Sequence, residues 1–186
     1  LNIYRVGEDA EFSDEEFLLA KRFGDAAALA IDNAHIRARL EHQAETDALT
    51  GLYNHRAFHD RLREALLIAS AAHDTVAVVM LDLDDFKKVN DVYGHGVGDQ
   101  LLNQVADVLR TTVRTTDVVC RVGGEEFAVI LPSGDLRSST ALSERIGEEL
   151  RKLQDTEAVG PLTVSTGIAV GPEHAANPRE LVACAE

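Results

Sequence analysis

The chain has 186 residues and is 45% apolar, which is enough to bury the core of one full domain and part of another. Its formal net charge of -14 and its pI near 4.8 argue against nucleic acid or an anionic membrane as a direct partner, because both are bound through clusters of Lys and Arg. A nucleotide stays compatible with this charge, provided that a divalent metal and a few local cations meet its phosphates.

The two cysteines, Cys120 and Cys184, are isolated in the sequence. They predict neither a disulfide framework nor a zinc site, and they fit a reducing compartment such as the cytoplasm. We expect the seven histidines to be surface or turn residues rather than metal ligands. No apolar run reaches the roughly 18 residues that a membrane-spanning helix needs, and we expect the chain, which starts without Met, to be part of a longer protein.

The N-terminal segment predicts a strand followed by one long helix. Residues 1–6 favour a short strand and residues 7–12 a turn. The helix is predicted to begin at Ser13, a candidate N-cap with Glu16 at capping-box spacing, and to continue to about Gln43.

Part of this helix resembles the seam of a two-stranded coiled coil. Its members are spaced alternately three and four residues apart: Ala26, Leu29, Asn33, Ile36, Leu40 and Gln43. The alternative is an amphipathic helix that packs on its own domain. The pattern changes after Thr46, which predicts a domain boundary near residue 45 and divides the chain into residues 1–45 and 46–186.

The second segment is predicted to mix strands with helices. A loop over residues 51–55 leads into a helix whose inward face is Phe58, Leu62, Ala65, Leu66 and Ala69. Residues 76–83 (VAVVMLDL) are apolar at successive positions, which predicts a central strand that is buried on both faces and ends in acids. The remaining predicted elements are a helix over 98–113, strands over 118–122 and 126–131 joined by a tight turn at 123–125, a helix over 139–153, a strand over 162–170 and a helix over 178–186. Hairpin strands mixed with helices, without regular alternation, make the fold α+β.

Acidic residues lie at the end of the buried strand and in or beside the hairpin turn: Asp82, Asp84, Asp85, Glu125 and Glu126. Acids that emerge from an apolar strand are costly to desolvate unless a cation or hydrogen-bond donors meet them, and Mg²⁺ prefers carboxylate oxygens. These acids are therefore candidates for a metal site if the strand and the turn are neighbours. The alternative is that they are ordinary solvated strand ends.

Gly123 and Gly124 allow two interpretations. A hairpin turn that needs positive φ favours glycine, and so does a close approach of backbone N–H groups to a phosphate. Lys87, Lys88 and Arg121 are candidate phosphate cations, although single Lys and Arg residues are commonly just solvated.

Three motifs together resemble the successive signatures of GGDEF domains. They are residues 47–58 (DALTGLYNHRAF), 81–99 (LDLDDFKKVNDVYGHGVGD) and 121–127 (RVGGEEF), and the similarity covers about residues 46–186. The turn here has the sequence GGEEF, a variant that active members of the family also use. Residues 1–45 resemble the last strand and helix of a GAF sensory domain, followed by a linker stalk.

This resemblance implies a palm-like fold, similar to nucleotidyl cyclases and polymerases, in which helices flank a central, mainly antiparallel sheet preceded here by the long N-terminal helix. It also implies a diguanylate cyclase of bacterial signal transduction. Each domain of a homodimer holds one GTP, and each ribose 3′-oxygen attacks the α-phosphate of the opposite GTP, which gives cyclic di-GMP and two pyrophosphates. The alternative is a catalytically silent module that binds GTP or cyclic di-GMP and regulates a neighbouring domain.

Site residues follow from the resemblance position by position. The implied ligands of Mg²⁺, or of Mn²⁺ in its place, are Asp82, the Leu83 carbonyl and Glu125, and Glu126 is implied to help deprotonate the 3′-hydroxyl. The implied substrate contacts are Asn90 and Asp99 for guanine and Lys87, Arg121, Gly123 and Gly124 for the phosphates.

An R-x-x-D motif, Arg114 to Asp117, stands where many members of the family carry a product-inhibition site, and Arg145 matches an arginine that supplements it. Two features depart from the family pattern. The family continues with a Tyr-x-Ala-Lys segment that contacts the nucleotide phosphates, whereas this sequence ends before it, at Glu186, so the domain is expected to be C-terminally incomplete. Thr166 also stands where the family commonly has Ile.

Overall fold

The computed structural model describes residues 13–43, 45–153 and 162–186, with side chains throughout except over residues 33–43. Two compact units make up the chain, Leu1–Ala44 and Glu45–Glu186. The strand and turn predicted for residues 1–12 lie outside the described residues, and the assignment of the first unit to a GAF-like domain stays a prediction.

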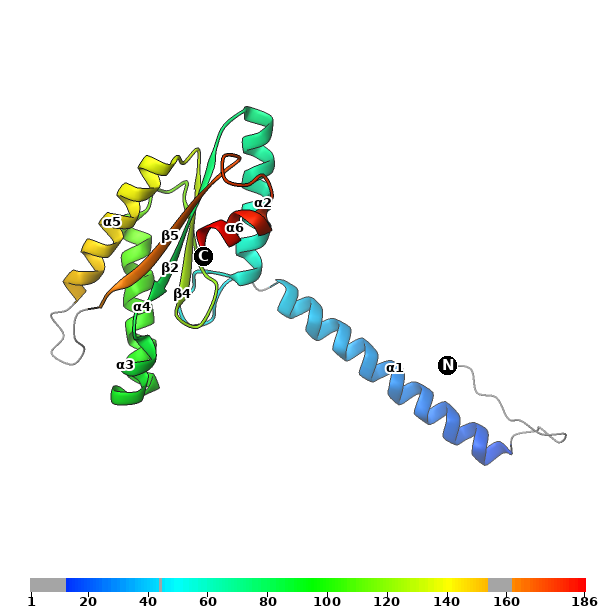
Figure 1. Cartoon of the computed structure of the whole chain (residues 1–186). Coiled ribbons are helices and arrows are strands. Elements are labelled where there is room, and N and C mark those ends of the chain that lie inside the picture. Colours follow the sequence, from blue (N-terminus) through cyan, green and yellow to red (C-terminus); the bar gives the residue numbers. More distant parts are fainter. Residues whose placement is uncertain (1–12, 44, 154–161) are drawn as a thin grey trace. The chain divides into compact units, whose positions relative to one another are not determined.

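The first unit contains the predicted long helix, α1 (Asp14–Gln43), which Figure 1 shows as one uninterrupted rod. Its start has the predicted capping box. The backbone N–H of Glu16 donates to the Ser13 hydroxyl at 3.3 Å, and the backbone N–H of Ser13 donates to the Glu16 carboxylate at 3.0 Å. Leu29, a member of the proposed seam, is 63% exposed in the isolated chain. The seam itself stays a prediction, because most of its side chains lie outside the described residues.

The second unit is built on a five-stranded sheet with the order β1-β3-β4-β2-β5. Its strands are β1 (Tyr53–Asn54), β2 (Val76–Leu83), β3 (Val118–Arg121), β4 (Glu126–Pro132) and β5 (Val164–Gly171). The β1–β3 pair is parallel and the other three neighbouring pairs are antiparallel. The predicted α+β fold with a mainly antiparallel central sheet is therefore confirmed.

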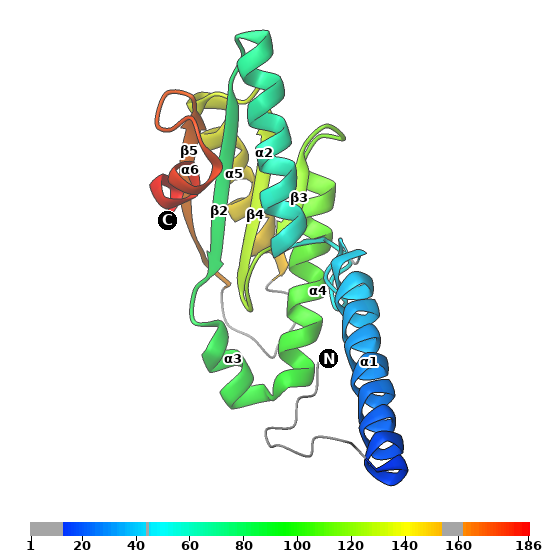
Figure 2. The ribbon, with the colours of Figure 1, turned by 90° about the vertical axis from the view of Figure 1, so that its right-hand side faces the viewer.

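Helices cover both faces of this sheet (Figures 1 and 2). On one face lie α2 (His55–Ala72) and α6 (Pro178–Ala185), and on the other lie α3 (Phe86–Tyr93), α4 (His95–Thr112) and α5 (Leu136–Lys152). Consecutive residues of β2 alternate between the two cores, with Val78 packed on the first face and Val79 on the second, and both are fully buried. This double burial explains why the strand is apolar at nearly every position.

Several predicted element bounds need correction. The helix expected over 98–113 begins at His95, the helix expected over 139–153 begins at Leu136, and α3 was not predicted because it has only eight residues and buries only Phe86 and Val89. The loop expected over 51–55 contains the short strand β1, which is too brief for any periodicity to show. The predicted inward face of α2 packs against the core, with Ala65 partly buried and Ala57 buried in addition. Among the described helices, none is both long and apolar enough to cross a membrane.

Candidate active site

The acids predicted from the sequence meet at one end of the sheet. Asp82 on β2 is the register partner of Glu126 on β4 and of Ser165 on β5. The backbone N–H of Leu83 donates to the carbonyl of Glu125 at 3.2 Å, so the hairpin turn lies directly beside the end of β2. A pocket of about 250 Å³ opens there, lined by Met80, Leu81, Asp82, Glu126, Ser165, Thr166, Gly167, Ala185 and Glu186. The strand and the turn are therefore neighbours, as a metal site between them requires.

Two neighbouring acids already have partners within the protein. The Ser165 hydroxyl donates to Asp84 Oδ1 at 2.7 Å, and the backbone N–H of Asp84 donates to the carbonyl of Thr163 at 3.0 Å. Hydrogen bonds from the Thr163 and Ser165 side chains lower the pKa of Asp84 and keep its carboxylate charged. Asp85 forms an ion pair of 2.7 Å with Lys88, one turn along α3. Asp84 thus fastens the end of β2 to β5, an interaction that the sequence did not predict.

The glycines of the turn do not need positive φ. Among the described glycines, only Gly51 and Gly94 have it. A Cβ atom on Gly123 would lie 2.0 Å from a carboxylate oxygen of Glu126, so the Glu126 side chain would have to shift, whereas one on Gly124 would meet nothing within 4 Å. Of the two interpretations of these glycines, the one that requires positive φ in the hairpin turn is therefore wrong. The Glu126 side chain lies over Gly123 and leaves space around Gly124.

Arg121 is held by two protein groups. Its guanidinium donates to Asp47 Oδ1 at 3.0 Å and to the carbonyl of Gly124 at 2.7 Å. Burial acts to raise the pKa of Asp47, but hydrogen bonds from Thr50 and Arg121 outweigh it, so the pKa lies below its ordinary value. Arg121 therefore ties the beginning of the domain to the turn, a role that the sequence analysis did not assign to it.

The two residues assigned to guanine lie on neighbouring helices, α3 and α4. Asn90, which is half-buried, lies on α3, and Asp99 lies exposed in the first turns of α4. Gly98 lets these helices approach, because a Cβ atom there would lie 2.0 Å from Asn90 Oδ1 and 3.2 Å from the Phe86 ring. Asn90 thus packs against the residue that precedes Asp99, and the pairing of its amide with the Asp99 carboxylate stays a prediction.

A family model described as "Diguanylate cyclase, GGDEF domain" matches residues 44–186. The chain belongs to this family. Its GGDEF domain is 39% identical over 147 residues to the probable diguanylate cyclase DgcT of Escherichia coli, an alignment that covers 77% of this chain and 32% of the relative. Across the first curated relatives that it matches, the chain spans about a third of their length or less.

Solved structures agree with this assignment. This chain aligns with the crystal structure of the coiled coil and GGDEF domain of DgcB from Caulobacter crescentus in complex with c-di-GMP. The TM-score is 0.69 at 30% identity, and the alignment covers 89% of this chain and 88% of the DgcB chain. This chain also aligns with the structure of the active GGEEF domain of a diguanylate cyclase from Vibrio cholerae. The TM-score is 0.60 at 26% identity, and the alignment covers 63% of this chain and 75% of the Vibrio chain.

The R-x-x-D residues of the GGDEF domain line a second pocket. Arg114, Asp117 and Arg145 border a hollow of about 120 Å³, together with Leu131, Pro132, Gly134, Ser138, Ala141 and Leu142. The backbone N–H of Arg114 donates to Asp117 Oδ2 at 2.9 Å, which fixes the turn, and Arg145 donates to the carbonyl of Thr112. Strand β3 lies along the chain between the R-x-x-D motif and the GGEEF turn.

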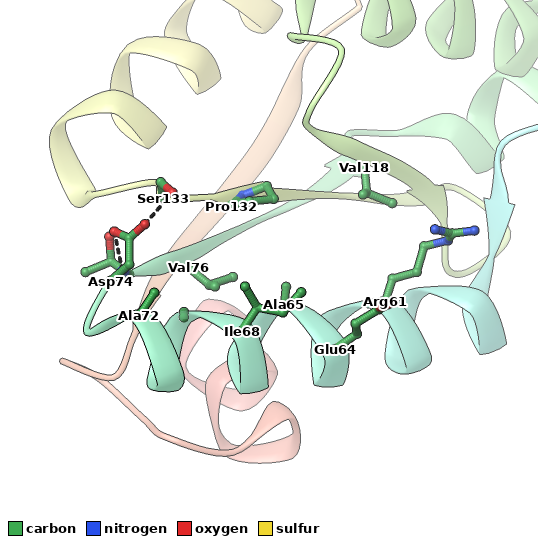
Figure 3. Close-up of a pocket in the computed structure, with 12 residues that line it drawn as sticks. Arg61, Glu64, Ala65, Ile68, Ala72, Asp74, Val76, Val118, Pro132 and Ser133 are labelled. Atoms are coloured by element: carbon green, nitrogen blue, oxygen red, sulfur yellow. Dashed lines mark hydrogen bonds between the residues drawn. The ribbon is translucent and has the colours of Figure 1, made fainter.

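A third hollow of the GGDEF domain lies between α2 and the sheet and is mostly apolar (Figure 3). Ala65, Ile68 and Val118 line its middle, and a hydrogen bond between the Ser133 hydroxyl and Asp74 closes one end. None of the site residues predicted from the sequence lines this hollow.

The donor set at the sheet end suits magnesium. Within the described residues, no group of three or more His, Cys, Asp or Glu side chains lies close enough together to hold a metal ion. Mg²⁺ is commonly bound through only one or two carboxylates, with substrate phosphates and waters as its other ligands. Asp82 and Glu125, with the backbone between them, fit that requirement, and neither offers a nitrogen or sulfur atom that would favour another metal.

Proposed function

We propose that this GGDEF domain is an active diguanylate cyclase that condenses two GTP molecules into cyclic di-GMP and two pyrophosphates. The observation that carries this proposal is the proximity of the acidic end of β2 to the acidic hairpin turn at one end of the sheet. Asp82 lies in register with Glu126, next to the turn that holds Glu125, and α3, which carries Asn90, follows β2 directly. Metal, phosphate and base therefore have complementary groups within one region.

In this proposal Asp82, the Leu83 carbonyl and Glu125 would hold Mg²⁺, or Mn²⁺ in its place. An ion bound there would supply Lewis-acid chemistry, polarising the α-phosphate and making the 3′-hydroxyl more acidic. Glu126, whose carboxylate lies over Gly123, is the group assigned to accept the hydroxyl proton. The Gly124 backbone, which has open space around it, and Lys87, which is exposed, meet the phosphates.

Arg121 acts in this proposal as a positioning residue as well as a phosphate contact. Its guanidinium holds the carbonyl of Gly124, so it fixes the turn on which Glu125 stands. Guanine is recognised by Asn90 and Asp99, because an amide and a carboxylate match the acceptor and the N–H donors of its edge. Gly98, which precedes Asp99, packs against the Asn90 amide and is consistent with this assignment.

The GGEEF sequence is compatible with catalysis, because the matched Vibrio cholerae domain is described as active. The alternative, a silent module that only binds nucleotides, is disfavoured by the intact acids Asp82, Glu125 and Glu126. Each domain holds one GTP, so ring closure needs two domains, and we assign activity to a cytoplasmic homodimer. The predicted GAF-like segment would then couple a signal to this pairing.

Product feedback is the second part of the proposal. Arg114, Asp117 and Arg145 line one pocket, in which two guanidinium groups meet phosphate and a carboxylate meets guanine N–H groups. DgcB, the matched Caulobacter protein, is described in complex with c-di-GMP. Cyclic di-GMP bound here would reduce turnover.

Incubation of the chain with GTP and Mg²⁺, followed by chromatographic and mass-spectrometric identification of the products, tests the proposed activity. Cyclic di-GMP and pyrophosphate in a 1:2 ratio are expected. Binding of GTP without any product would favour the silent module, and a different cyclic nucleotide would contradict the assignment of Asn90 and Asp99 to guanine.

A further inference from the structure

Two histidines that the proposed reaction does not use lie close together on the surface of α2. His55 is the first residue of this helix and is exposed, and His59 lies one turn later and is half-buried. Their Nε2 atoms are 3.3 Å apart and share a hydrogen bond, and their rings meet edge to face with centroids 4.6 Å apart. The two imidazole nitrogens thus lie next to each other on the helix surface.

This separation matches a metal chelate. Zinc binds imidazole nitrogen at about 2.0–2.1 Å with tetrahedral geometry, so two such ligands have nitrogens about 3.3 Å apart. Histidines four residues apart on one helix face are also the spacing by which helices present a zinc pair. The chain therefore holds both nitrogens at the required separation, and a bound ion would replace the hydrogen bond between them.

The ring of His59 is anchored to the core. It packs edge to face on Phe58, at a centroid distance of 5.1 Å, and Phe58 is fully buried. This packing limits the positions that the Nε2 atom of His59 can take.

We propose that His55 and His59 form a bidentate site for a zinc-class divalent ion on the first turns of α2. Imidazole selects Zn²⁺ over Mg²⁺, so this site is chemically distinct from the carboxylate site assigned to GTP. Asp60 is engaged by ion pairs with Arg56 and Arg63, and no third His, Cys, Asp or Glu completes a cluster within the part of the chain that the structure describes. The remaining coordination positions are filled by water, which makes the site open and exchangeable.

An ion at this site would cross-link two residues of α2 near the beginning of the domain. A bound ion joins residues one helical turn apart, immediately after the N-cap Asn54, whose side chain accepts a hydrogen bond from the backbone N–H of Ala57. Asn54 also pairs in register with Arg121 of β3. Zinc would therefore stabilise the first turn of α2 and the short β1–β3 pairing next to it.

Zinc titration of the tag-free, metal-free chain, followed by calorimetry in a non-chelating buffer, tests the proposal. The titration is done with Cys184→Ser, because an exposed thiol also binds zinc. One ion per chain with micromolar affinity is expected, together with a higher melting temperature. His55→Ala and His59→Ala should each weaken binding by roughly tenfold or more, because loss of one ligand removes the chelate advantage.

The matched control is His73→Asn, which changes an exposed histidine at the other end of the same helix and keeps a residue type that tolerates its positive φ of 54°. This variant should bind zinc as the parent does. Circular dichroism without zinc checks that both alanine variants fold, and ¹⁵N spectra of the imidazole rings should show zinc-dependent shifts at both Nε2 atoms. Equal zinc affinity in the parent, His55→Ala and His59→Ala would overturn the proposal.

Discussion

The guanidinium of Arg121 donates a hydrogen bond of 3.0 Å to the carboxylate of Asp47, a residue 74 positions earlier in the chain. The same guanidinium donates to the carbonyl of Gly124 in the GGEEF turn. The side chains of this ion pair are only 13% exposed for Arg121 and 25% exposed for Asp47, so solvent screens it less than it screens a surface pair. The beginning of the domain is thus fastened directly to the turn that carries Glu125.

This ion pair predicts a specific dependence of stability on pH. The pKa of Asp47 is lowered in the folded chain from the ordinary value of 3.8. A lowered carboxylate pKa contributes stability that is fully present above the unfolded pKa and is lost as the pH falls through the folded pKa. The free energy of unfolding of Asp47→Asn should therefore fall below that of the parent by a constant amount above about pH 5, and this difference should shrink below about pH 4.

Urea unfolding between pH 3 and pH 7 measures this difference. Asp107→Asn is the matched control, because Asp107 also pairs with an arginine, Arg110, but has a 73% exposed side chain. The control should differ little from the parent at any pH. A difference for Asp47→Asn that does not change with pH would contradict the role given to its charge.

The sequence predicted some elements of this fold well and others poorly, for identifiable reasons. Strand β2 matches its predicted bounds, because burial on both faces leaves a continuous apolar run from Val76 to Leu83. Helix α3 left no such signal, since its two buried residues are three apart in a short polar segment. Thr166, which stands where the family commonly has Ile, accepts a hydrogen bond of 2.9 Å from the Ser143 hydroxyl on α5. No local sequence pattern predicts this contact.

Site residues divide in the same way. Resemblance could name Asp82 and Glu125, but not the contacts that fix them, because those contacts depend on strand register. The His55 and His59 spacing is visible in the sequence, and the histidines were nevertheless expected to be isolated surface residues. Only side-chain packing, here of His59 on Phe58, brings the two Nε2 atoms to one point.

The packing of Gly98 predicts a change in substrate affinity. A Cβ atom in Gly98→Ala would lie 2.0 Å from Asn90 Oδ1, so the amide assigned to guanine must move. The KM for GTP should rise roughly tenfold, about the effect of losing one hydrogen bond, with a smaller change in kcat. Gly96→Ala, in the same helical turn, is the matched control, because its Cβ would meet nothing within 4 Å. Steady-state kinetics with similar KM values for the two variants would argue against Asn90 as a guanine contact.

Removal of the proposed metal ligands should abolish turnover while the fold persists. Asp82→Asn and Glu125→Gln keep the size of the side chain but lose the charge that holds Mg²⁺, so cyclic di-GMP formation should fall by at least about a hundredfold. Both residues lie at the sheet end rather than in either core, so thermal melting should change little. Quantification of cyclic di-GMP at several Mg²⁺ concentrations decides this, and parental turnover in either variant would contradict the ligand assignment.

The R-x-x-D pocket predicts tight product binding that depends on Arg114. Arg114→Ala should weaken cyclic di-GMP binding by roughly ten- to a hundredfold, since it removes charge-assisted hydrogen bonds to phosphate. Arg137→Ala changes an exposed arginine of α5 that does not line the pocket, and it should bind like the parent. Calorimetry with cyclic di-GMP measures both affinities. Unchanged binding by Arg114→Ala would rule out this pocket as the product site.

Activity is predicted to require two domains and to depend on one face of α1. With one GTP in each domain, the reacting 3′-oxygen and α-phosphate belong to different subunits, so specific activity should rise with protein concentration until dimers saturate.

Leu29→Glu should shift the chain toward monomer and reduce activity roughly tenfold at a concentration where the parent is dimeric, because it places a charge in the proposed seam. Ile31→Glu is the matched control, since Ile31 is similarly exposed, at 56% against 63%, but lies two residues away on another helix face. Analytical ultracentrifugation combined with an activity titration tests both variants. Full, concentration-independent activity in a monomeric variant would contradict the two-domain mechanism, whereas equal dimerisation of Leu29→Glu and the parent would place the dimer contact on another face.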